Sequence, residues 1–228
     1  ALQRALALEA AGQPAQPVAL LIESLAGPLL ELGRHGEALE LMLRPRPPEA
    51  GPRNRLDELV RAENLCAAFQ AEGRLKEAEV LARQALHGLD AAFPASAHDA
   101  RPPAARARLA HVLHVQGFAA EAEPFLREAL RGYEVSLGQH HPETLGCVRN
   151  LAVLLKQLAQ AGHGRQPQTQ QRLSEVEGLL KRAQHGYIKA LGSEHPEAQR
   201  AVRNAMNFKH WRAQKYGKSS ESSAANTP

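Results

Sequence analysis

The chain has 228 residues, of which 43% are hydrophobic and 4% aromatic, and its formal net charge at pH 7 is +4. This is the composition of an ordinary folded protein, and so small a net charge does not by itself indicate a nucleic-acid-binding protein. The two cysteines, Cys66 and Cys147, provide neither a disulfide framework nor a metal-ligand spacing. No apolar run approaches the length of a membrane span, so we expect no membrane insertion.

One sequence pattern is complete in three copies along the chain and incomplete in a fourth. It consists of a Leu-Ala or Leu-Cys pair, a glycine eight residues after the leucine, and Glu-Ala four residues after the glycine. The first three glycines, Gly33, Gly73 and Gly117, lie 40 and 44 residues apart. In the fourth copy Ala159 replaces the glycine. Repetition at this spacing predicts stacked helix pairs, because each unit alone is too small to bury its apolar face.

The N-terminal third is predicted to contain incomplete units. Residues 1–11 carry the Ala-Leu pair seen in later second helices, so we expect them to be the second helix of a preceding unit. The chain begins with alanine, which indicates a fragment or a processed product. Residues 17–48 form a degenerate unit, since Pro45, Pro47 and Pro48 remove backbone donors and shorten its second helix.

Three fuller units follow, at residues 53–93, 102–138 and 142–192. Each is predicted to be a helix, a connection and a second helix. In the first two units the connection is a tight turn, in which the glycine closes the first helix in a left-handed conformation. The last unit contains a Gln-rich and Gly-rich stretch, residues 160–171, which we interpret as a mobile insert between its two helices. This insert is either a neutral length variation or a docking element.

The C-terminal region is predicted to end the array. Residues 196–216 form one more helix without a partner, which is typical of a capping helix with a polar outer face. Residues 217–228 are rich in Ser, Ala and Asn and are predicted to be disordered. No strand-like alternation competes with the helical stripes, so the predicted fold class is all-α, an antiparallel helix-pair superhelix.

The combined motif resembles the tetratricopeptide repeat. It reads Asn-Leu-Ala, glycine, Glu-Ala-Glu, Ala-Leu and a closing Leu-Gly-x-x-His-Pro, the last at residues 137–142 and 191–196. This ending resembles the repeat type of kinesin light chains and nephrocystin-3-like proteins, over about residues 20 to 210. The resemblance implies a right-handed superhelical solenoid whose first helices line a concave peptide-binding groove.

In such proteins the asparagine of the first helix hydrogen-bonds the backbone of a bound peptide. The matching positions here are Asn64, Asn150 and Asn204, while Arg108 takes the place of the asparagine in the third unit. Neighbouring positions of the last helix add further groove candidates, namely Arg200, Asn207 and Trp211. The alternative is that these asparagines cap helices or bridge them, with no ligand.

Several residues invite a chemical role but have a simpler structural explanation. His111 and His114 are one helical turn apart, as in a metal pair, yet no further ligand completes a zinc site. Cys66 occupies a small-residue core position, and Cys147 could face the groove without an activating neighbour. The repeated Glu-Ala-Glu sequences fit helix-dipole stabilisation, and the loop histidines, His140, His141 and His195, fit capping. We predict no catalysis, metal, cofactor or small-molecule substrate.

The function predicted from the sequence is a non-catalytic interaction scaffold or adaptor that binds a peptide or partner subunit, inside a multi-subunit complex. The alternative is a nucleic-acid-associated component, because cations cluster near the C-terminus with interleaved aromatic side chains. These cations are Arg203, Lys209, Arg212 and Lys215. The expected location is intracellular, either cytoplasmic or cytoskeletal and ciliary, with an organelle lumen also open.

Overall fold

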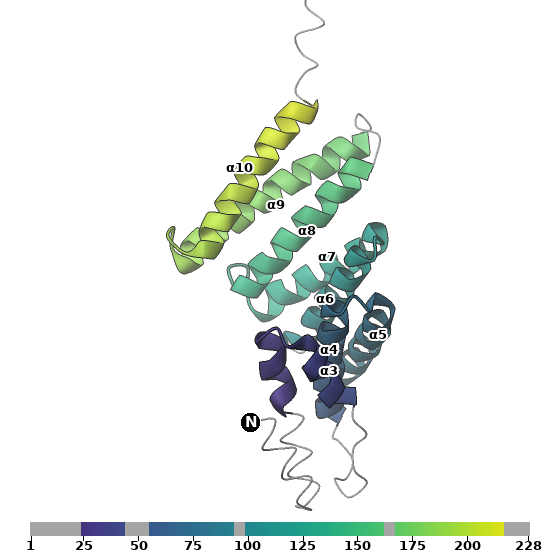
Figure 1. The fold of residues 1–228 in the computed structure, drawn as a ribbon. Coiled ribbons are helices and arrows are strands. Elements are labelled where there is room, and N and C mark those ends of the chain that lie inside the picture. Colours follow the sequence, from purple (N-terminus) through teal and green to yellow (C-terminus); the bar gives the residue numbers. More distant parts are fainter. Residues whose placement is uncertain (1–23, 44–54, 94–98, 162–166, 217–228) are drawn as a thin grey trace, which may run out of the picture. The chain divides into compact units, whose positions relative to one another are not determined.

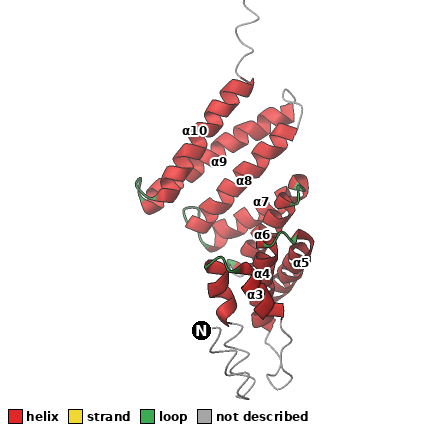
Figure 2. Cartoon of the chain, in the orientation of Figure 1, coloured by secondary structure: helices red, strands yellow, loops and turns green. Residues whose placement is uncertain are grey.

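The computed structural model describes residues 24–43, 55–93, 99–161 and 167–216 (Figure 1). The segments predicted as a preceding second helix, 1–11, and as a disordered tail, 217–228, lie outside these residues, as does part of the degenerate unit 17–48. The described residues form helices joined by short turns, without a strand among them, which confirms the all-α fold class (Figure 2). None of the described helices is long and apolar enough to cross a bilayer.

The chain divides into two compact units, Ala1–Ser96 and Ala97–Pro228, and each is described by itself. The first unit contains a helical segment at residues 24–31, followed by α3 (His35–Leu43), α4 (Arg55–Ala71) and α5 (Leu75–Ala92). Helix α3 ends at Leu43, immediately before the proline-rich segment. Within this unit α3 contacts α4, and α4 packs along α5.

The second unit contains five helices in chain order. They are α6 (Arg101–Val115), α7 (Ala119–Ser136), α8 (Pro142–Ala161), α9 (Pro167–Leu191) and α10 (Pro196–Tyr216). Each of these helices packs against the next one along the chain, which is the arrangement of stacked helix pairs (Figure 1). Helices α6, α8 and α10 are first helices, and α7 and α9 are second helices.

The repeated glycines close the first helices as the sequence predicts. Gly33, Gly73 and Gly117 have φ angles of 72°, 74° and 93°, in the left-handed region that favours glycine. At Gly73, the Arg74 N–H donates to the Phe69 carbonyl at 2.8 Å, so the chain reverses while the last carbonyls of α4 stay hydrogen-bonded. The same bonding recurs at Gly33 and Gly117.

The two helices of each pair approach closely through a second set of glycines. A Cβ atom added to Gly88, Gly132 or Gly186 would overlap a side chain of the first helix of the same pair. The overlapping side chains are Leu59, Pro103 and Leu145, respectively. The small residues predicted to allow close helix packing are also buried, namely Ala78, Ala85, Ala122, Ala129 and Ala183. Close approach of this kind excludes water and gives the contacting atoms dense packing.

The turns between pairs are built on the Leu-Gly-x-x-His-Pro motif. Gly138 and Gly192 have φ angles of 90° and 87°, and the histidine that follows precedes the first residue of α8 or α10. The Nδ1 atom of His141 accepts a hydrogen bond from the Glu143 N–H at 3.2 Å, and His195 accepts one from the Glu197 N–H at 3.2 Å. The predicted capping role of these two histidines is confirmed.

The structure differs from the predicted insert at residues 160–171. Helix α8 continues through Ala161, and α9 already begins at Pro167, so much of the Gln-rich stretch is helical and only residues 162–166 lie outside the described chain. Glutamine is a good helix former, and proline fits the first helical position. Glu175 therefore lies well inside α9, whereas Glu37, Glu77 and Glu121 lie in first turns, where they stabilise the helix dipole.

Candidate functional site

The first helices of the second unit meet along one surface. The His114 imidazole of α6 hydrogen-bonds the Gln157 side chain of α8, and Arg149 of α8 forms an ion pair with Glu197 of α10 at 2.9 Å. The Lys156 ammonium of α8 lies 4.8 Å from the ring centroid of Trp211 on α10. We call this surface the first-helix face. It carries His114 of α6, Arg149, Lys156 and Gln157 of α8, and Glu197 and Trp211 of α10.

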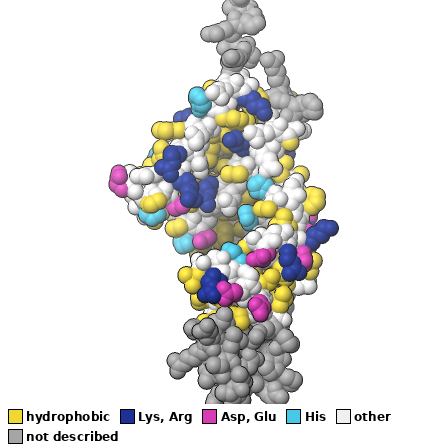
Figure 3. Space-filling model, viewed as in Figure 1, with side chains coloured by type: hydrophobic (Ala, Val, Ile, Leu, Met, Phe, Trp, Pro, Cys, Tyr) yellow, Lys and Arg dark blue, Asp and Glu magenta, His cyan; other side chains and the backbone are white. Residues whose placement is uncertain are grey.

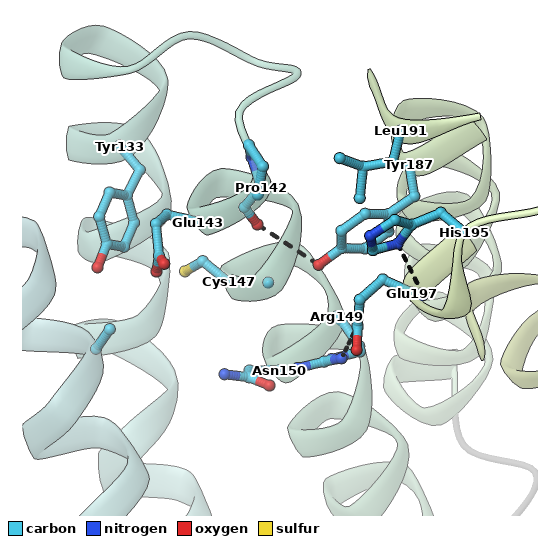
Figure 4. A pocket seen from close by; sticks show the side chains of 12 residues that line it. Tyr133, Pro142, Glu143, Cys147, Arg149, Asn150, Tyr187, Leu191, His195 and Glu197 are labelled. Carbon is cyan, nitrogen blue, oxygen red and sulfur yellow. Dashed lines mark hydrogen bonds and ion pairs between the residues drawn. The ribbon is translucent and has the colours of Figure 1, made fainter. Parts of the chain in front are cut away.

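A hollow of about 450 Å³ opens at the N-terminal half of α8 (Figure 4). Its walls come from α6, α8 and the start of α10, and its floor comes from the C-terminal ends of α7 and α9. A hollow of this size suits a few side chains of a peptide or a small ligand. The labelled lining residues include Tyr133, Glu143, Cys147, Arg149, Asn150, Tyr187, His195 and Glu197.

Two tyrosines of the lining come from equivalent positions. Tyr133 and Tyr187 each lie four residues before the leucine of a Leu-Gly-x-x-His-Pro motif, and both are buried. The Tyr187 hydroxyl donates to the Pro142 carbonyl at 3.5 Å, and burial raises the pKa of its phenol (Figure 4). The sequence reasoning missed both residues, although their repeated position before the motif was a usable signal.

Two charged residues of the hollow, Arg149 and Glu197, are paired with each other. Glu197 contacts Arg149 at 2.9 Å (Figure 4). It also contacts Arg200 at 3.2 Å. Arg200, predicted as a groove cation, is therefore already engaged by a carboxylate of its own helix. These side chains are a quarter to a half exposed, so the pairs contribute little to stability but orient the groups around the hollow.

The predicted groove residues differ in their exposure and in the unit to which they belong. Asn150 is exposed and lines the hollow, and Asn204 is half-buried at the equivalent position of α10. Asn207 is exposed on α10, and Trp211 is half-buried, with the Lys215 ammonium 5.6 Å from its ring centroid. Asn64 is half-buried on α4 and belongs to the first unit, whereas the other predicted groove residues belong to the second.

Arg108 stands where the other units have asparagine, and it changes the electrostatics of α6. Its Nε atom is buried and has no hydrogen-bond partner among the described residues. Burial, and then the charges of His114 and Arg108, lower the pKa of His111. The described residues contain no group of three His, Cys, Asp or Glu side chains that could hold a metal ion.

The two cysteines lie in the helix packing. Cys66 has no exposed surface, and its thiol donates to the Ala78 carbonyl at 3.4 Å, so the prediction of a core thiol is confirmed. Cys147 borders the hollow but is only 2% exposed, and its thiol faces the Leu126 carbonyl at 3.6 Å. Burial, and then the charge of Glu134, raise the pKa of Cys147 to about 12, which disfavours the nucleophilic thiolate.

The C-terminal cations differ in the contacts that their side chains make. Arg212 forms an ion pair with Glu177 of α9 at 2.7 Å, and Lys215 lies over the rings of Trp211 and Tyr216. Arg203 and Lys209 are exposed. The predicted basic patch is thus a set of separate cations along α10, two of which already contact other side chains of the unit.

Comparison with known proteins identifies the repeat. Residues 104–143, which include most of α6, all of α7, the following turn and the first two residues of α8, match the tetratricopeptide repeat family. No curated protein sequence matches the chain significantly. A solved structure of a putative kinesin light chain from Podosopora anserina, with nearly identical tetratricopeptide-like repeats, aligns with a TM-score of 0.64 and 20% identity, covering 85% of this chain and 86% of that one.

A point variant of the Podosopora anserina protein aligns with a TM-score of 0.62, again at 20% identity over 85% of this chain and 86% of that one. Both structures establish that the fold of this chain is a tetratricopeptide-like helical solenoid. The resemblance inferred from the sequence is therefore confirmed for the repeat and for the fold. A repeat of this kind supports a protein-interaction scaffold in general terms.

Proposed function

We propose that this chain is a non-catalytic interaction scaffold that binds an extended peptide, or a segment of a partner subunit, on the first-helix face. The observation that carries the proposal is the set of polar groups on this face that the protein itself leaves unpaired. Within the described residues, the side-chain amides of Asn150 and Asn204 have no hydrogen-bond partner, and neither has the buried Arg108 Nε.

Unpaired groups of this kind suit a peptide backbone. Each asparagine amide can donate and accept at once, so it matches the N–H and C=O of one peptide residue whatever its side chain is. Buried polar atoms such as the Arg108 Nε are normally paired, and a bound carbonyl or carboxylate would supply the missing acceptor. The hollow beside Asn150 would then take a side chain of the same peptide.

The side chains that could act as a nucleophile, an acid or a base do not favour a catalytic alternative. The Cys147 thiol has a raised pKa, and the His114 imidazole bonds an amide side chain. Glu197 is held by two arginines. These groups define and orient the binding face instead of forming a nucleophile with an activating base.

The test is a peptide selection against the full chain, followed by affinity measurement. Peptides selected from a random displayed library should lose about tenfold or more in affinity when Asn150→Ala and Asn204→Ala are combined, since each lost hydrogen bond costs about 1 kcal/mol. The matched control is Gln184→Ala, which removes an amide from α9, a second helix. Equal loss in both variants, or no loss in the double variant, would contradict the proposal.

A second candidate function is RNA or DNA association through α10. It is favoured by the charge of this helix, which carries five Lys and Arg residues and a single carboxylate, Glu197. The affinity of a single-stranded RNA should then fall steeply with salt. Neutralising Arg200, Arg203, Lys209 and Arg212 together should abolish RNA binding while leaving peptide binding on the α6–α8 part of the face.

The wider setting follows from the proposed scaffold role. We infer that the chain acts as an adaptor or as a structural subunit of a larger assembly, in the cytoplasm or on the cytoskeleton. Co-purification of an endogenous complex from cells, with the Asn150→Ala, Asn204→Ala double variant as the comparison, tests this inference. Loss of the same partners from the double variant supports it, and an unchanged partner set contradicts it.

A further inference from the structure

Helix α10 exposes the face that α8 buries. The Leu-Gly-x-x-His-Pro motif precedes both helices, so each residue of α10 corresponds to the residue of α8 that lies 54 positions earlier. In α8, one stripe of the helix is at most 1% exposed, and its first member contacts Gly186 of α9. This stripe consists of Leu145, Val148, Ala152, Leu155 and Ala159. Its counterpart in α10, which we call the open face, consists of Gln199, Val202, Met206, Lys209 and Ala213.

The open face lacks a covering helix in the described chain. Helix α10 buries the stripe that borders this face, including Ala201 and Phe208, and packs against α9. On the open face, Met206 is 64% exposed and Val202 is half-buried, while the other three residues are exposed. The following sequence, residues 217–228, contains no Val, Leu, Ile, Met or aromatic residue that could repeat the packing of α9 on α8.

The charge of α10 selects the kind of helix that could cover this face. It carries five cations and one carboxylate, Glu197, which is already paired with Arg149 and Arg200. Arg212 is paired with Glu177 of α9, so Arg203, Lys209 and Lys215 remain without an ion pair among the described residues.

Lys209 stands where α8 has the buried Leu155. Its charge contributes, after the hydrogen bond from Lys181, to the lowered pKa of Glu177 on α9, but it lies too far from that carboxylate for an ion pair within the described residues. In the view of Figure 3, Lys and Arg side chains are spread over the region of α8–α10.

The α6–α7 pair shows how such a cation is accommodated. Arg106 lies on α6 at the position equivalent to Val148 and Val202, and it contacts Glu128 of the covering helix α7 at 3.3 Å. A cation at one position of the stripe is therefore compatible with a covering helix, provided that this helix supplies a carboxylate.

We propose that the open face of α10 binds an amphipathic, acidic α-helix of a partner protein. Its apolar side chains cover Val202, Met206 and Ala213, and a carboxylate of the partner helix pairs with Lys209. A second copy of the chain fits this face poorly, because two α10 helices would bring their cations together. A nucleic acid would pair with the cations but would leave the apolar strip uncovered. This surface is separate from the proposed peptide site around Asn150.

The chain itself provides a probe of the required chemistry. A synthetic peptide of residues 119–136 reproduces α7, a second helix that already covers a first helix and contains the contact glycine, Gly132. It carries four glutamates against two arginines. We expect the labelled peptide to bind the full chain in fluorescence anisotropy, and we expect the same peptide with all four glutamates changed to glutamine to bind about tenfold more weakly.

Substitutions in the protein locate the binding site. Met206→Asp and Lys209→Glu should each weaken the peptide about tenfold, as expected when the centre of a small interface is altered. Both positions are exposed, so folding should be retained, which circular dichroism checks. Arg203→Glu is the matched control, because it makes the same change of charge as Lys209→Glu at an exposed position of α10 outside the open face. It should leave the affinity nearly unchanged.

Several results would overturn the proposal. These are absence of peptide binding to the full chain, equal weakening by Arg203→Glu and Lys209→Glu, and insensitivity to Met206→Asp. Tighter binding of a single-stranded RNA that is lost in Lys209→Glu would assign the face to nucleic acid. Concentration-dependent dimerisation that Met206→Asp abolishes would assign it to a second copy. The Asn150→Ala, Asn204→Ala variant should bind the acidic peptide normally, so this test fails or succeeds independently of the groove proposal.

Discussion

The interior of each helix pair and the junction between the second helices of successive pairs are held together by different interactions. Inside a pair, apolar side chains of the first helix pack on a glycine of the second, as Leu145 does on Gly186. At the junction between the second helices α7 and α9, charged groups meet instead. Arg127 binds Glu175 through two hydrogen bonds of 2.6 and 2.9 Å, and Arg182 contacts Glu134 at 2.5 Å.

This difference explains which features of the sequence vary between units. The contact glycines Gly88, Gly132 and Gly186 lie 44 and 54 residues apart, yet each meets the equivalent side chain of its first helix. The packing inside a pair is therefore retained when the connection between the helices lengthens. Junction side chains at the surface tolerate more change, because partly exposed ion pairs contribute little and can be rearranged.

Shortening a side chain inside a pair should have the largest effect. Leu145 has no exposed surface, so Leu145→Ala removes buried contacts and leaves a cavity beside Gly186. We expect a loss of about 3 kcal/mol in the free energy of unfolding, measured by urea denaturation followed by circular dichroism. A loss comparable to that of an exposed surface substitution would show that the pair interior does not dominate stability.

Adding a methyl group at a contact glycine should lower the free energy of unfolding by a smaller amount. In Gly132→Ala the new Cβ would lie 2.5 Å from Cγ of Pro103, whose ring cannot rotate away. The expected overpacking outweighs the gain in helix propensity and leaves a net loss of about 1 kcal/mol.

The matched control for that substitution is Gly178→Ala in α9, where no atom lies within 4 Å of the added Cβ. Here only the helix propensity changes, and we expect stabilisation by about 0.5–1 kcal/mol. Thermal unfolding of the two variants gives the comparison. Stabilisation of both variants would show that the contact with Pro103 does not determine the effect of Gly132→Ala.

The junction should show the smallest energy and the strongest salt dependence. Arg127 and Glu175 are each more than a third exposed, so a double-mutant cycle of Arg127→Met and Glu175→Gln should give a coupling of only about 0.5–1 kcal/mol. In about 1 M NaCl most of this coupling should disappear, because salt screens partly exposed charges. A salt-independent coupling of several kcal/mol would place the junction among the dominant stabilising contacts.

Much of the fold could be predicted from the sequence, because its signals are local. The left-handed turns at Gly33, Gly73 and Gly117 and the start of α8 at Pro142 depend on backbone preferences that single residues carry. The start of α9 could not be placed in the same way. The Gln-rich stretch before it has a polar composition that suits both a loop and an exposed helix, and packing against α8 decides between them.

The candidate site was predictable only in part. Asn150 and Asn204 follow from the repeat register, but the hollow depends on side chains from five helices, including Tyr187 and Arg149, which are distant in sequence. The pairing of Arg200 with Glu197 was also hidden, since a pattern of residue types does not show which charges are already satisfied. The open face of α10 could not be predicted either, because residue types do not show that equivalent positions of α8 and α10 differ in burial.

The most direct test of the scaffold account is photo-cross-linking of a selected peptide to the full chain, with the adducts mapped by mass spectrometry. A peptide that carries benzoylphenylalanine next to its binding motif should attach to α6, α8 and α10, close to Arg108, Asn150 or Asn204. Adducts confined to the second helices α7 and α9, or scattered without preference over the surface, would contradict the central claim that the first helices form the binding face.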